Sequence, residues 1–536
     1  MGMAVSRLGG YMSKITINKM SYYYEDFYNP VYENINLVIK TEWKLGLIGR
    51  NGRGKTTLLK LLTGELEPTA GNIGIPVEVE YFPYENTCGY TLTRDIIKEN
   101  VGKLKSMEDT MEAIISQNDE ARFDEYAMLQ EQYLELDGYE MESKVLKEMD
   151  EMGLDSTLLE REFETLSGGE KTRIMLLTLF LRKKSFVLLD EPTNHLDDEG
   201  KEAVIAYLQK KKGFIVVSHD RSFLDKVIDH VISINKKDIT IEKGNYTSWK
   251  YNKDKKEEFE LRTRERLEEE IAQLERSAKT SRTWAELGNM QKYQFASHGR
   301  ANGVERYMKQ AKRSETRVQD NIDKKKQLLQ NYEEVKPLVM HQKNDIEEKC
   351  LIRIKELGFK YAEGEKQIIK GFNFEVHAGD RIWIKGKNGV GKSTLLKLLS
   401  GVLPDKAIEY AEGLHIAMVA QEPAWKKGYI KEGFEGIIAN PVYERFLELC
   451  DYFELPENFL ERPLETYSSG ELKKVNIARA LAEENHIILF DEPLNYMDTY
   501  LSEQLETAIL KYQPTIIFVE HDSYFGQAIA TRTIQL

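Results

Sequence analysis

The chain has 536 residues, of which 41% are hydrophobic and 31% are charged, and its formal net charge is −14. That length exceeds what a single hydrophobic core supports, so several domains are expected, and the acidic balance argues against a protein that coats nucleic acid. The sequence contains no apolar run long enough to span a membrane and no secretory leader, and its three scattered cysteines favour a reducing cytoplasm.

Four short motifs occur twice in the same order, which indicates a tandem duplication. The pairs are GRNGRGKTT (Gly49–Thr57) and GKNGVGKST (Gly386–Thr394), LSGGE (Leu166–Glu170) and YSSGE (Tyr467–Glu471), FVLLDEPTNHLD (Phe186–Asp197) and IILFDEPLNYMD (Ile487–Asp498), and VSHD (Val217–Asp220) and VEHD (Val519–Asp522). We therefore predict a tail over residues 1–12, a first α/β domain over 13–243, a linker over 244–345 and a second α/β domain over 346–536.

The first motif of each copy follows a short apolar run and precedes LLKLL, which is the strand–loop–helix context of a phosphate-binding loop, or P-loop. Its glycines let backbone N–H groups face phosphates at a helix N-terminus. Lys55 and Lys392 are placed to neutralise phosphate oxygens, and Thr56 and Ser393 are placed to hold Mg²⁺. The other phosphate-binding candidates are Gly49, Asn51, Gly52, Gly54 and Thr57, and in the second copy Gly386, Asn388, Gly389, Gly391 and Thr394.

An insertion distinguishes the two copies. From the P-loop lysine to the serine of the second motif there are 112 residues in the first copy and 76 in the second, so about 36 extra residues fall within 100–152. Acidic, helix-forming runs split at Asp137–Gly138 predict a helical arm at about 100–140. This arm is either a docking element or a solvated helical excursion.

The second motif places a serine and small residues ahead of a predicted helix. Its members are Ser167, Gly168 and Gly169 in the first copy and Ser468, Ser469 and Gly470 in the second. Hydroxyl and N–H groups at such a position make an anion site. Because each copy already has a P-loop for its own phosphates, the economical interpretation is that each of these motifs covers nucleotide bound by the other half.

Two buried strands end in adjacent carboxylates. Asp190 and Asp491 suit a metal shell, and Glu191 and Glu492 are placed to polarise an attacking water. The alternative is a pair of carboxylates that cap a helix. His219 and His521 follow β-rich runs and are candidates to bond the γ-phosphate and that water, against the alternative of structural histidines.

The linker differs in composition from both copies. A helical run at Asp254–Glu275 is followed by the polar stretch Leu287–Gly303 and a second helical run at about Val304–Asn331, which predicts an antiparallel hairpin with a tip. Residues 276–326 contain 13 Lys or Arg against 5 Asp or Glu, interleaved with aromatic side chains. Cations among planar rings favour RNA, whereas a solvated amphipathic helix pair is the alternative.

The order of these motifs resembles the ATP-binding cassette (ABC) superfamily over both copies. The resemblance implies two nucleotide-binding domains in a head-to-tail sandwich that hydrolyses ATP with Mg²⁺ at two sites. Site one is expected to use Lys55, Asp190, Glu191 and His219 with Ser468 and Gly470, and site two Lys392, Asp491, Glu492 and His521 with Ser167 and Gly169.

The same resemblance makes Tyr24 and Tyr361 the candidates for stacking on adenine. Tyr22 and Tyr23 compete with Tyr24, and aromatic core packing is the alternative for all of them. Gln421 stands at the glutamine of the Q-loop and is expected among the metal and nucleotide ligands, but Tyr84 occupies the corresponding place in the first copy. Tyr84 at the Q-loop position and Ser469 in place of a glycine both belong to site one. We therefore predict that site one hydrolyses ATP more slowly than site two, or mainly holds the two halves together.

Tandem cassettes joined by a helical linker resemble the ABC-F family. That likeness implies a monomer in the cytoplasm that binds the E site of the 70S ribosome, with its linker near 23S rRNA, the P-site tRNA and the peptidyl-transferase centre. The long linker and the DEPLNYMD motif resemble the Lsa/Vga resistance members, so displacement of lincosamides, pleuromutilins and group A streptogramins is expected, with ATP hydrolysis driving release. A housekeeping ABC-F translation factor is the first alternative, and the ATPase subunit of a transporter is the second.

Overall fold

The structure is a computed structural model, and most of the chain outside the second half of the linker is described in it. The described residues are 13–24, 30–84, 88–117, 119–183, 185–194, 196–235, 238–295, 338–361, 367–387, 389–423, 425–434, 441–456, 458–495 and 497–536. By their contacts, residues 1–246 and 337–536 form one compact unit, and residues 247–336 form another. Both cassettes therefore belong to the same unit.

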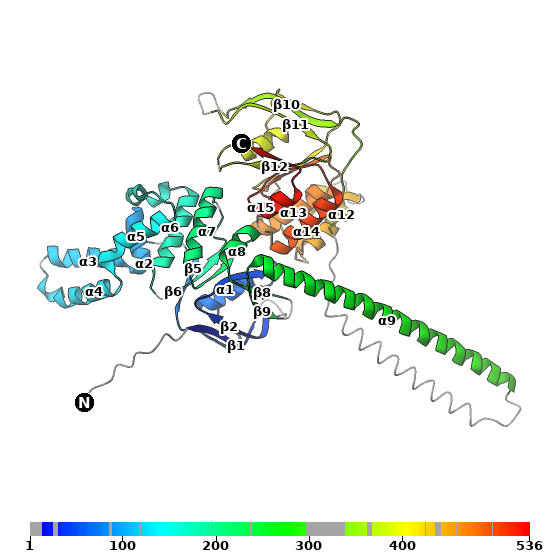
Figure 1. The fold of residues 1–536 in the computed structure, drawn as a ribbon, viewed down its shortest axis with the longest axis horizontal. Coiled ribbons are helices and arrows are strands. Elements are labelled where there is room, and N and C mark those ends of the chain that lie inside the picture. Colours follow the sequence, from blue (N-terminus) through cyan, green and yellow to red (C-terminus); the bar gives the residue numbers. More distant parts are fainter. Residues whose placement is uncertain are drawn as a thin grey trace. The chain divides into compact units, whose positions relative to one another are not determined.

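A six-stranded sheet forms the larger sheet of the first cassette, in the order β5–β6–β7–β3–β8–β9. Its strands β5, β6, β8 and β9 are labelled in Figure 1. Its strands are β3 (Lys44–Gly49), β5 (Glu78–Phe82), β6 (Ser185–Asp190), β7 (Phe214–Val217), β8 (His230–Ile234) and β9 (Ile239–Lys243). All neighbours pair in parallel except β8 and β9. The apolar runs FVLL and FIVV are fully buried, as expected for parallel strands whose two faces are both covered.

A smaller antiparallel sheet completes the β structure of this cassette, in the order β2–β1–β4. Its strands are β1 (Lys14–Tyr22), β2 (Tyr32–Lys40) and β4 (Ala70–Gly74). Alternate residues of β1 and β2 face one hydrophobic core with the leucines of α1 (Lys55–Thr63). The first P-loop therefore leads into a helix that packs between the two sheets.

The remaining helices of the first cassette include those of the predicted insertion. They are α2 (Thr93–Gly102), α3 (Leu104–Ser116), α4 (Phe123–Glu135), α5 (Met141–Glu151), α6 (Gly168–Leu181), α7 (Asp198–Lys210) and α8 (Arg221–Val227). Helices α3 and α4 occupy most of residues 100–140. Helix α4 ends just before Asp137, which has a left-handed backbone (φ 56°), and a Cβ on Gly138 would lie 2.3 Å from the ring of Tyr133.

The second cassette repeats this architecture. Its parallel sheet has the order β14–β15–β16–β12–β17 and its antiparallel sheet the order β11–β10–β13. The strands are β10 (Cys350–Phe359), β11 (Ile369–His377), β12 (Arg381–Lys385), β13 (Ile408–Tyr410), β14 (Ile416–Val419), β15 (Ile487–Asp491), β16 (Ile516–Val519) and β17 (Arg532–Gln535). The helices are α11 (Lys392–Leu399), α12 (Pro441–Tyr452), α13 (Ser469–Ala482), α14 (Thr499–Tyr512) and α15 (Ser523–Ile529). Two α/β halves of one topology confirm the predicted fold class.

The described part of the linker is one long helix, α9 (Tyr246–Phe295). The sequence predicted a polar tip from Leu287 onward, whereas the helix continues through Leu287 to Phe295. No proline interrupts this stretch, and a single glycine within a helix costs only about 1 kcal/mol relative to alanine. The predicted second run, Val304–Asn331, lies outside the described residues. Among the residues that are described, no helix is both long and apolar enough to cross a membrane.

The end of the linker also differs from its predicted boundary at residue 345. Leu338 and Met340 are buried in the hydrophobic core of the second cassette. The side-chain amide of Gln342 donates to the carbonyl of His486 at 2.6 Å and accepts from the amide of Thr515 at 3.1 Å. Residues 338–342 therefore belong structurally to the second cassette, because alternate apolar residues after Pro337 find a core to enter.

Buried charges connect the two cassettes. Arg221, at the start of α8, donates from Nε to Asp522 at 3.1 Å and from an Nη to Glu506 at 2.9 Å, and its side chain is 8% exposed. Tyr246, the first residue of α9, donates its hydroxyl to Glu503 at 2.9 Å, one turn before Glu506 on α14. The ionic contacts of Arg221 thus join α8 of one cassette to α14 and α15 of the other.

Replacing Arg221 by methionine should destabilise the folded chain. Removing one partner of a buried ion pair leaves carboxylates without compensation, which typically costs about 3–5 kcal/mol. We expect the midpoint of thermal unfolding, measured by calorimetry, to fall by several degrees. Adding Asp522→Asn and Glu506→Gln should recover most of the loss, because the uncompensated charges are then gone. An unchanged midpoint for Arg221→Met would contradict this account of the buried pair.

Candidate active site

Each P-loop connects the central parallel strand of its cassette to a helix. In both, the lysine folds back over its own loop: Lys55 Nζ donates to Gly49 O at 2.6 Å, and Lys392 Nζ donates to Gly386 O at 2.6 Å. Gly54 and Gly391 cap the helices with φ angles of 92° and 110°. A Cβ there would lie 2.6 Å from Val31 or 2.5 Å from Ile368, so only glycine fits.

The rest of each loop follows the predicted pattern. Gly52 and Gly389 both have positive φ angles. Lys55 Nζ also lies 3.1 Å from Asn51 Oδ1, and Ser393 hydrogen-bonds Asp491. Thr56 is exposed, and Asn388 lies outside the described residues. Each cassette therefore has a helix N-terminus at its P-loop with a lysine beside it.

One tyrosine stands beside each P-loop at the same spacing. The hydroxyl of Tyr24 is 3.0 Å from Thr57 Oγ1, and that of Tyr361 is 3.1 Å from Thr394 Oγ1. Their side chains are 39% and 53% exposed, whereas Tyr22 is buried in the core. The contact with Thr57 distinguishes Tyr24 from the exposed Tyr23. An open aromatic face next to a phosphate loop is what an adenine ring needs.

The paired carboxylates lie at the carboxyl ends of β6 and β15. Glu191 and Glu492 have left-handed backbones, with φ angles of 51° and 50°, and their amides donate to Val217 O and Val519 O at 2.9 and 3.0 Å. A glutamate rarely adopts this conformation, and such strain persists where surrounding structure imposes it, commonly at active sites. The same strained position in both cassettes marks these residues as functional candidates.

Each predicted histidine faces its glutamate. His219 Nε2 is 3.3 Å from Glu191 Oε1, and His521 Nε2 is 3.5 Å from Glu492 Oε1. Two matched pairs in two cassettes favour the functional interpretation over structural histidines. Carboxylate, imidazole, lysine and an adjacent aspartate are the groups that phosphoryl transfer to water requires.

The two pairs differ in their electrostatics. Burial, followed by the charge of Asp190, raises the pKa of Glu191 to about 8, and burial lowers the pKa of His219 to about 4. In the second cassette, contact with Asp198 and then Glu492 raises the pKa of His521 to about 9. Burial alone raises the pKa of Glu492, but His521 brings it below its ordinary value. The neighbours of the second pair therefore favour its ionic form, whereas burial favours the neutral form of the first.

The Q-loop positions differ as the sequence indicated. Gln421 donates from Nε2 to Glu492 Oε2 at 2.9 Å. Tyr84 instead hydrogen-bonds Thr178 in α6, and burial raises its pKa to about 12. The glutamine expected among the metal ligands is thus bonded to the catalytic candidate of its own cassette, while the tyrosine is directed to a helix.

Two further residues were missed by the sequence analysis. Tyr81 donates its hydroxyl to Asp190 Oδ2 at 2.8 Å, where the aligned residue of the second cassette is Met418. Lys473 donates to the carbonyls of Ala420 and Asp491, both at 2.9 Å, where the first cassette has a threonine. A position-by-position comparison of the two copies would have identified both residues as differences. It would not have predicted which atoms their side chains contact.

The second motif of each copy, LSGGE or YSSGE, caps a helix, and we call these the signature motifs. Ser167 and Ser468 are the N-caps of α6 and α13, and each forms a reciprocal capping box with the glutamate three residues later, Glu170 or Glu471. The serine amide and hydroxyl each donate to that carboxylate, at 2.8–2.9 Å. The S-x-x-E pattern predicts this cap from sequence, and the anion-site interpretation overlooked it.

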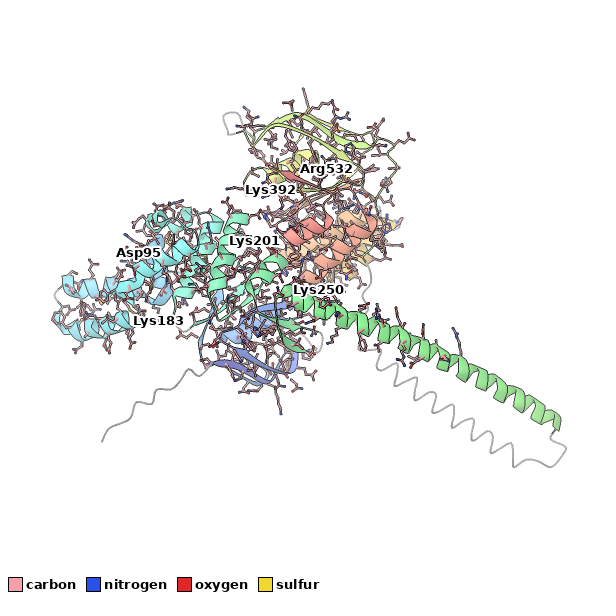
Figure 2. The ribbon with its side chains drawn as sticks, in the orientation of Figure 1. Asp95, Lys183, Lys201, Lys250, Lys392 and Arg532 are labelled. Carbon is pink, nitrogen blue, oxygen red and sulfur yellow. The ribbon has the colours of Figure 1, made fainter. Side chains whose placement is uncertain are left out.

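One cavity brings both cassettes together at the second P-loop. Its volume is about 900 Å³, and it is lined by residues of both halves, among them Tyr361, Gly389, Gly391, Lys392, Ser393, Thr394, Gln421, Glu492 and His521 of the second and Gly168, Leu196, Lys201 and His219 of the first. Lys201 and Lys392 are labelled in Figure 2. Signature residue Gly168 therefore shares a cavity with the P-loop of the other cassette.

The first P-loop also meets the other cassette, through different groups. The amide of Asn51 donates to Asp498 Oδ2 at 2.6 Å, and Arg50 forms an ion pair with Glu454 at 2.9 Å. Ser468 bonds Glu471 within its own cassette. The first P-loop is thus contacted from the other cassette by Asp498, the residue that follows the DEPLNYM run.

The residues fit a bound Mg²⁺ in the second cassette. Asp491 is 2% exposed, and its Oδ1 atom has no hydrogen-bond partner among the described residues. A buried carboxylate oxygen without a partner is costly unless a cation or water meets it. In the first cassette Tyr81 already occupies one oxygen of Asp190, so the two metal positions are not equivalent.

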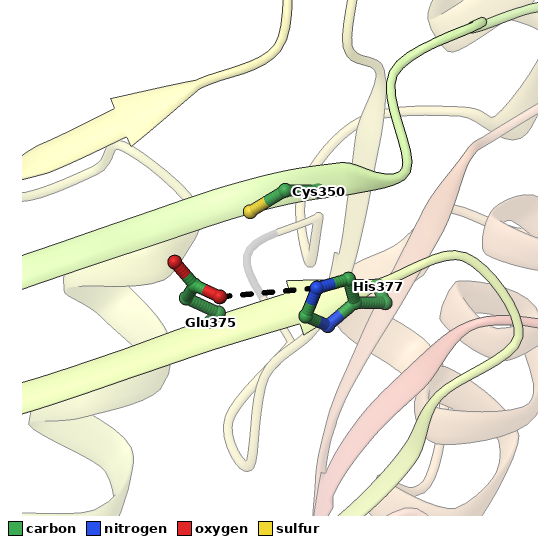
Figure 3. A group of neighbouring side chains, drawn as sticks. All are labelled: Cys350, Glu375 and His377. Atoms are coloured by element: carbon green, nitrogen blue, oxygen red, sulfur yellow. Dashed lines mark ion pairs between the residues drawn. The ribbon is translucent and has the colours of Figure 1, made fainter.

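A separate cluster of possible metal ligands lies on the antiparallel sheet (Figure 3). Cys350 is the cross-strand neighbour of His377, and Glu375 lies on the same face of β11. Glu375 is already paired with Arg353 at 2.7 Å, and Cys350 Sγ lies 3.5 Å from the carbonyl of Ile352. These contacts account for the cluster, and we assign no metal to it.

Comparison with known proteins gives a consistent family. The model described as ABC transporter matches residues 32–194 and 369–495. The chain is 27% identical to ABC transporter F family member 2 of Arabidopsis thaliana over 98% of this chain and 76% of that relative. It is also 27% identical to ribosome protection protein VmlR of Bacillus subtilis over 95% of this chain and 84% of VmlR. The crystal structure of archaeal ribosome recycling factor aABCE1, in complex with stalk protein aP1, shares the fold, with a TM-score of 0.55 and 20% identity over 96% of this chain and 87% of that one.

The geometry predicts unequal turnover at the two sites. Glu492 is ionised beside Gln421 and His521, whereas Glu191 is held neutral by burial, so we expect Glu492→Gln to remove most steady-state ATPase activity and Glu191→Gln to remove less. Phosphate release from each single variant, measured under saturating ATP, checks this. Equal losses from the two substitutions would refute the asymmetry.

Proposed function

The chain belongs to the ABC family of ATP-binding domains and is an ATPase with tandem cassettes of ABC-F-like type, and we propose that it hydrolyses MgATP at two composite sites to control binding to the ribosome. Each site would combine the P-loop, strand-end carboxylates and histidine of one cassette with the signature motif of the other. The observation that carries this proposal is the cavity in which Gly168 joins Lys392 and Glu492.

In site two, the chain's own residues have separable roles. Lys392 and the amides from Gly389 to Thr394 bind phosphate oxygens, and Tyr361 stacks on the adenine. Ser393, Asp491 and Gln421 would hold Mg²⁺, which neutralises charge on the phosphates when bound. Glu492 orients and polarises the attacking water, and His521 bonds the γ-phosphate and fixes the glutamate. Ser167 and Gly169 complete the site from the opposite cassette.

Site one would use the corresponding groups, Lys55, Thr56, Asp190, Glu191 and His219, with Tyr24 on the adenine and Ser468, Ser469 and Gly470 from the second cassette. Its glutamate lacks a glutamine neighbour, and its aspartate is shared with Tyr81. Slow hydrolysis in a site that keeps the cassettes joined follows from this arrangement.

Ribosome binding is supported by the relatives and by the linker. VmlR is named a ribosome protection protein and aABCE1 a ribosome recycling factor. The stretch 276–326 carries eight more basic than acidic residues on an acidic chain, as expected for contact with rRNA and tRNA phosphates. We propose that this linker enters the 70S ribosome from the E site and approaches the P-site tRNA and 23S rRNA. ATP would favour the bound state, and hydrolysis would favour release.

The finer proposal is antibiotic displacement. The resemblance to Lsa/Vga-type members, and the presence of a ribosome protection protein among the relatives, support action on lincosamides, pleuromutilins and group A streptogramins. A housekeeping role in translation is the alternative, favoured by the equal identity to an F family member from a plant. A role as a transporter subunit would instead require a membrane partner.

A double Glu191→Gln, Glu492→Gln variant should accumulate on ribosomes in ATP, because both sites would bind nucleotide without hydrolysing it. Sedimentation of the purified chain with 70S ribosomes measures this. The same variant in ADP, and a Lys55→Ala, Lys392→Ala variant in ATP, serve as controls that should remain unbound. If the double glutamine variant also sediments apart from ribosomes in ATP, the ribosome proposal fails.

Expression of the chain in a drug-sensitive bacterium should raise the inhibitory concentration of lincosamides severalfold. A variant in which Leu287–Gly303 is replaced by a short Gly–Ser linker should lose this effect while its ATPase activity persists. Inhibitory concentrations on solid medium, with an aminoglycoside as a drug of another site, give the comparison. Unchanged susceptibility together with ribosome binding in the previous experiment would favour the housekeeping role.

A further inference from the structure

The histidine of site two is held by two residues of the opposite cassette. Asp198 Oδ1 lies 3.6 Å from His521 Nδ1, and Lys201 Nζ donates to the carbonyl of His521 at 3.1 Å. Both residues come from the first turn of α7, which begins immediately after the first DEPTNHLD motif. The ring and the main chain of His521 are thus contacted from the same helix.

Lys201 is itself held in place. Its side chain is 11% exposed, and its ammonium forms an ion pair with Asp220 at 2.5 Å. Asp220 is the N-cap of α8, next to His219, and accepts from the amide of Phe223. A buried ammonium with a carboxylate on one side and a carbonyl on the other has little freedom to move.

Among the residues that the structure describes, the first site shows no equivalent of this pair. Thr499 and Ser502 occupy the corresponding positions of α14. Ser502 Oγ donates to Asp498 O within its own helix, and Thr499 hydrogen-bonds Tyr246. The ring nitrogen and the amide of His219 both contact Glu191, in its own cassette. The duplication has therefore diverged at the two positions of the helix that reach across the boundary.

From these contacts we infer that Asp198 and Lys201 are positioning residues of the first cassette for hydrolysis in site two, and that site one has no such pair. The partner of one ring nitrogen sets the orientation and tautomer of an imidazole, so Asp198 at Nδ1 aims Nε2 at Glu492. Lys201 fixes the backbone from which that ring projects.

The consequence is directional coupling. His521 is correctly oriented only while α7 of the first cassette is docked beside it, so opening the cassettes would release the histidine of site two before any change in its own cassette. His219 keeps its contact with Glu191, and the charge of Asp498 at the N-cap of α14 acts on it from the opposite cassette, but Thr499 and Ser502 supply neither a carboxylate nor an ammonium there. The rate of hydrolysis in site two therefore depends on whether the two cassettes are closed against each other.

The inference rests on the assignment of the two ATP sites, and single-site backgrounds separate the two ideas. In a Glu191→Gln chain, hydrolysis comes from site two, and in a Glu492→Gln chain it comes from site one. Asp198→Thr installs the residue that the second cassette carries at this position. We expect it to lower kcat at least about tenfold in the first background, with little change in KM, because Lys392, the loop amides and Tyr361 keep most of the contacts that bind ATP. In the second background the loss should stay below about twofold.

Matched variants distinguish positioning from general damage. Glu202→Gln removes another exposed carboxylate of α7, one that pairs with Lys226 in its own cassette, and should not change the ratio of kcat between the backgrounds. Asp198→Asn keeps an acceptor for the imidazole and should recover part of the lost kcat. Lys201→Arg, which keeps the charge beside Asp220, should lower kcat in the Glu191→Gln background only.

The outcomes decide between the two ideas. Equal losses from Asp198→Thr in both backgrounds, or a loss that appears only in KM, would overturn the positioning role. If the Glu191→Gln, Glu492→Gln double variant retained turnover, the assignment of the sites would fail instead, independently of Asp198.

Discussion

Charged side chains buried where the two cassettes meet require partners, because an uncompensated ion in a low-dielectric environment costs several kcal/mol. Arg221 is compensated by Asp522 and Glu506, and Lys201 by Asp220, in each case with little exposure to solvent. Asp498, 2% exposed, accepts from the first P-loop. These contacts make each nucleotide site depend on the cassette that does not carry its P-loop.

The same contacts extend to the start of the linker. Glu503 and Glu506 lie one turn apart on α14, one bound to Tyr246 and the other to Arg221. Helix α14 begins directly after Asp498, whose carboxylate touches the first P-loop. One helix therefore contacts a nucleotide loop, the neighbouring cassette and the first residue of α9. Under the proposed switch, α14 is a described element that joins the boundary between the cassettes to the first residue of the linker helix.

Duplication preserved the parts that bind nucleotide and altered those that tune hydrolysis. The tyrosine–threonine contacts, the left-handed glycines, the strained glutamates and the capping boxes recur almost unchanged in both cassettes. Gln421 and Lys473 stand where the first cassette has Tyr84 and Thr172; Gln421 donates to Glu492, and the charge of Lys473 lowers the pKa of Glu492. Each difference leaves the second glutamate with more partners for its charged form.

The sequence by itself determined the features that depend on near neighbours in the chain: the α/β halves, the P-loops, the strand-end carboxylates and the choice of Lys55, Lys392, Glu191 and Glu492. Glycine conformation, strand burial and helix capping are local, so a motif a few residues long predicts them. Only the tertiary structure decided which groups meet across long sequence separations. Tyr81 reaches Asp190, Lys201 reaches His521 and Leu338 enters the second core because strands and helices distant in the chain pack together, and no periodicity within one segment encodes the identity of its partner in another.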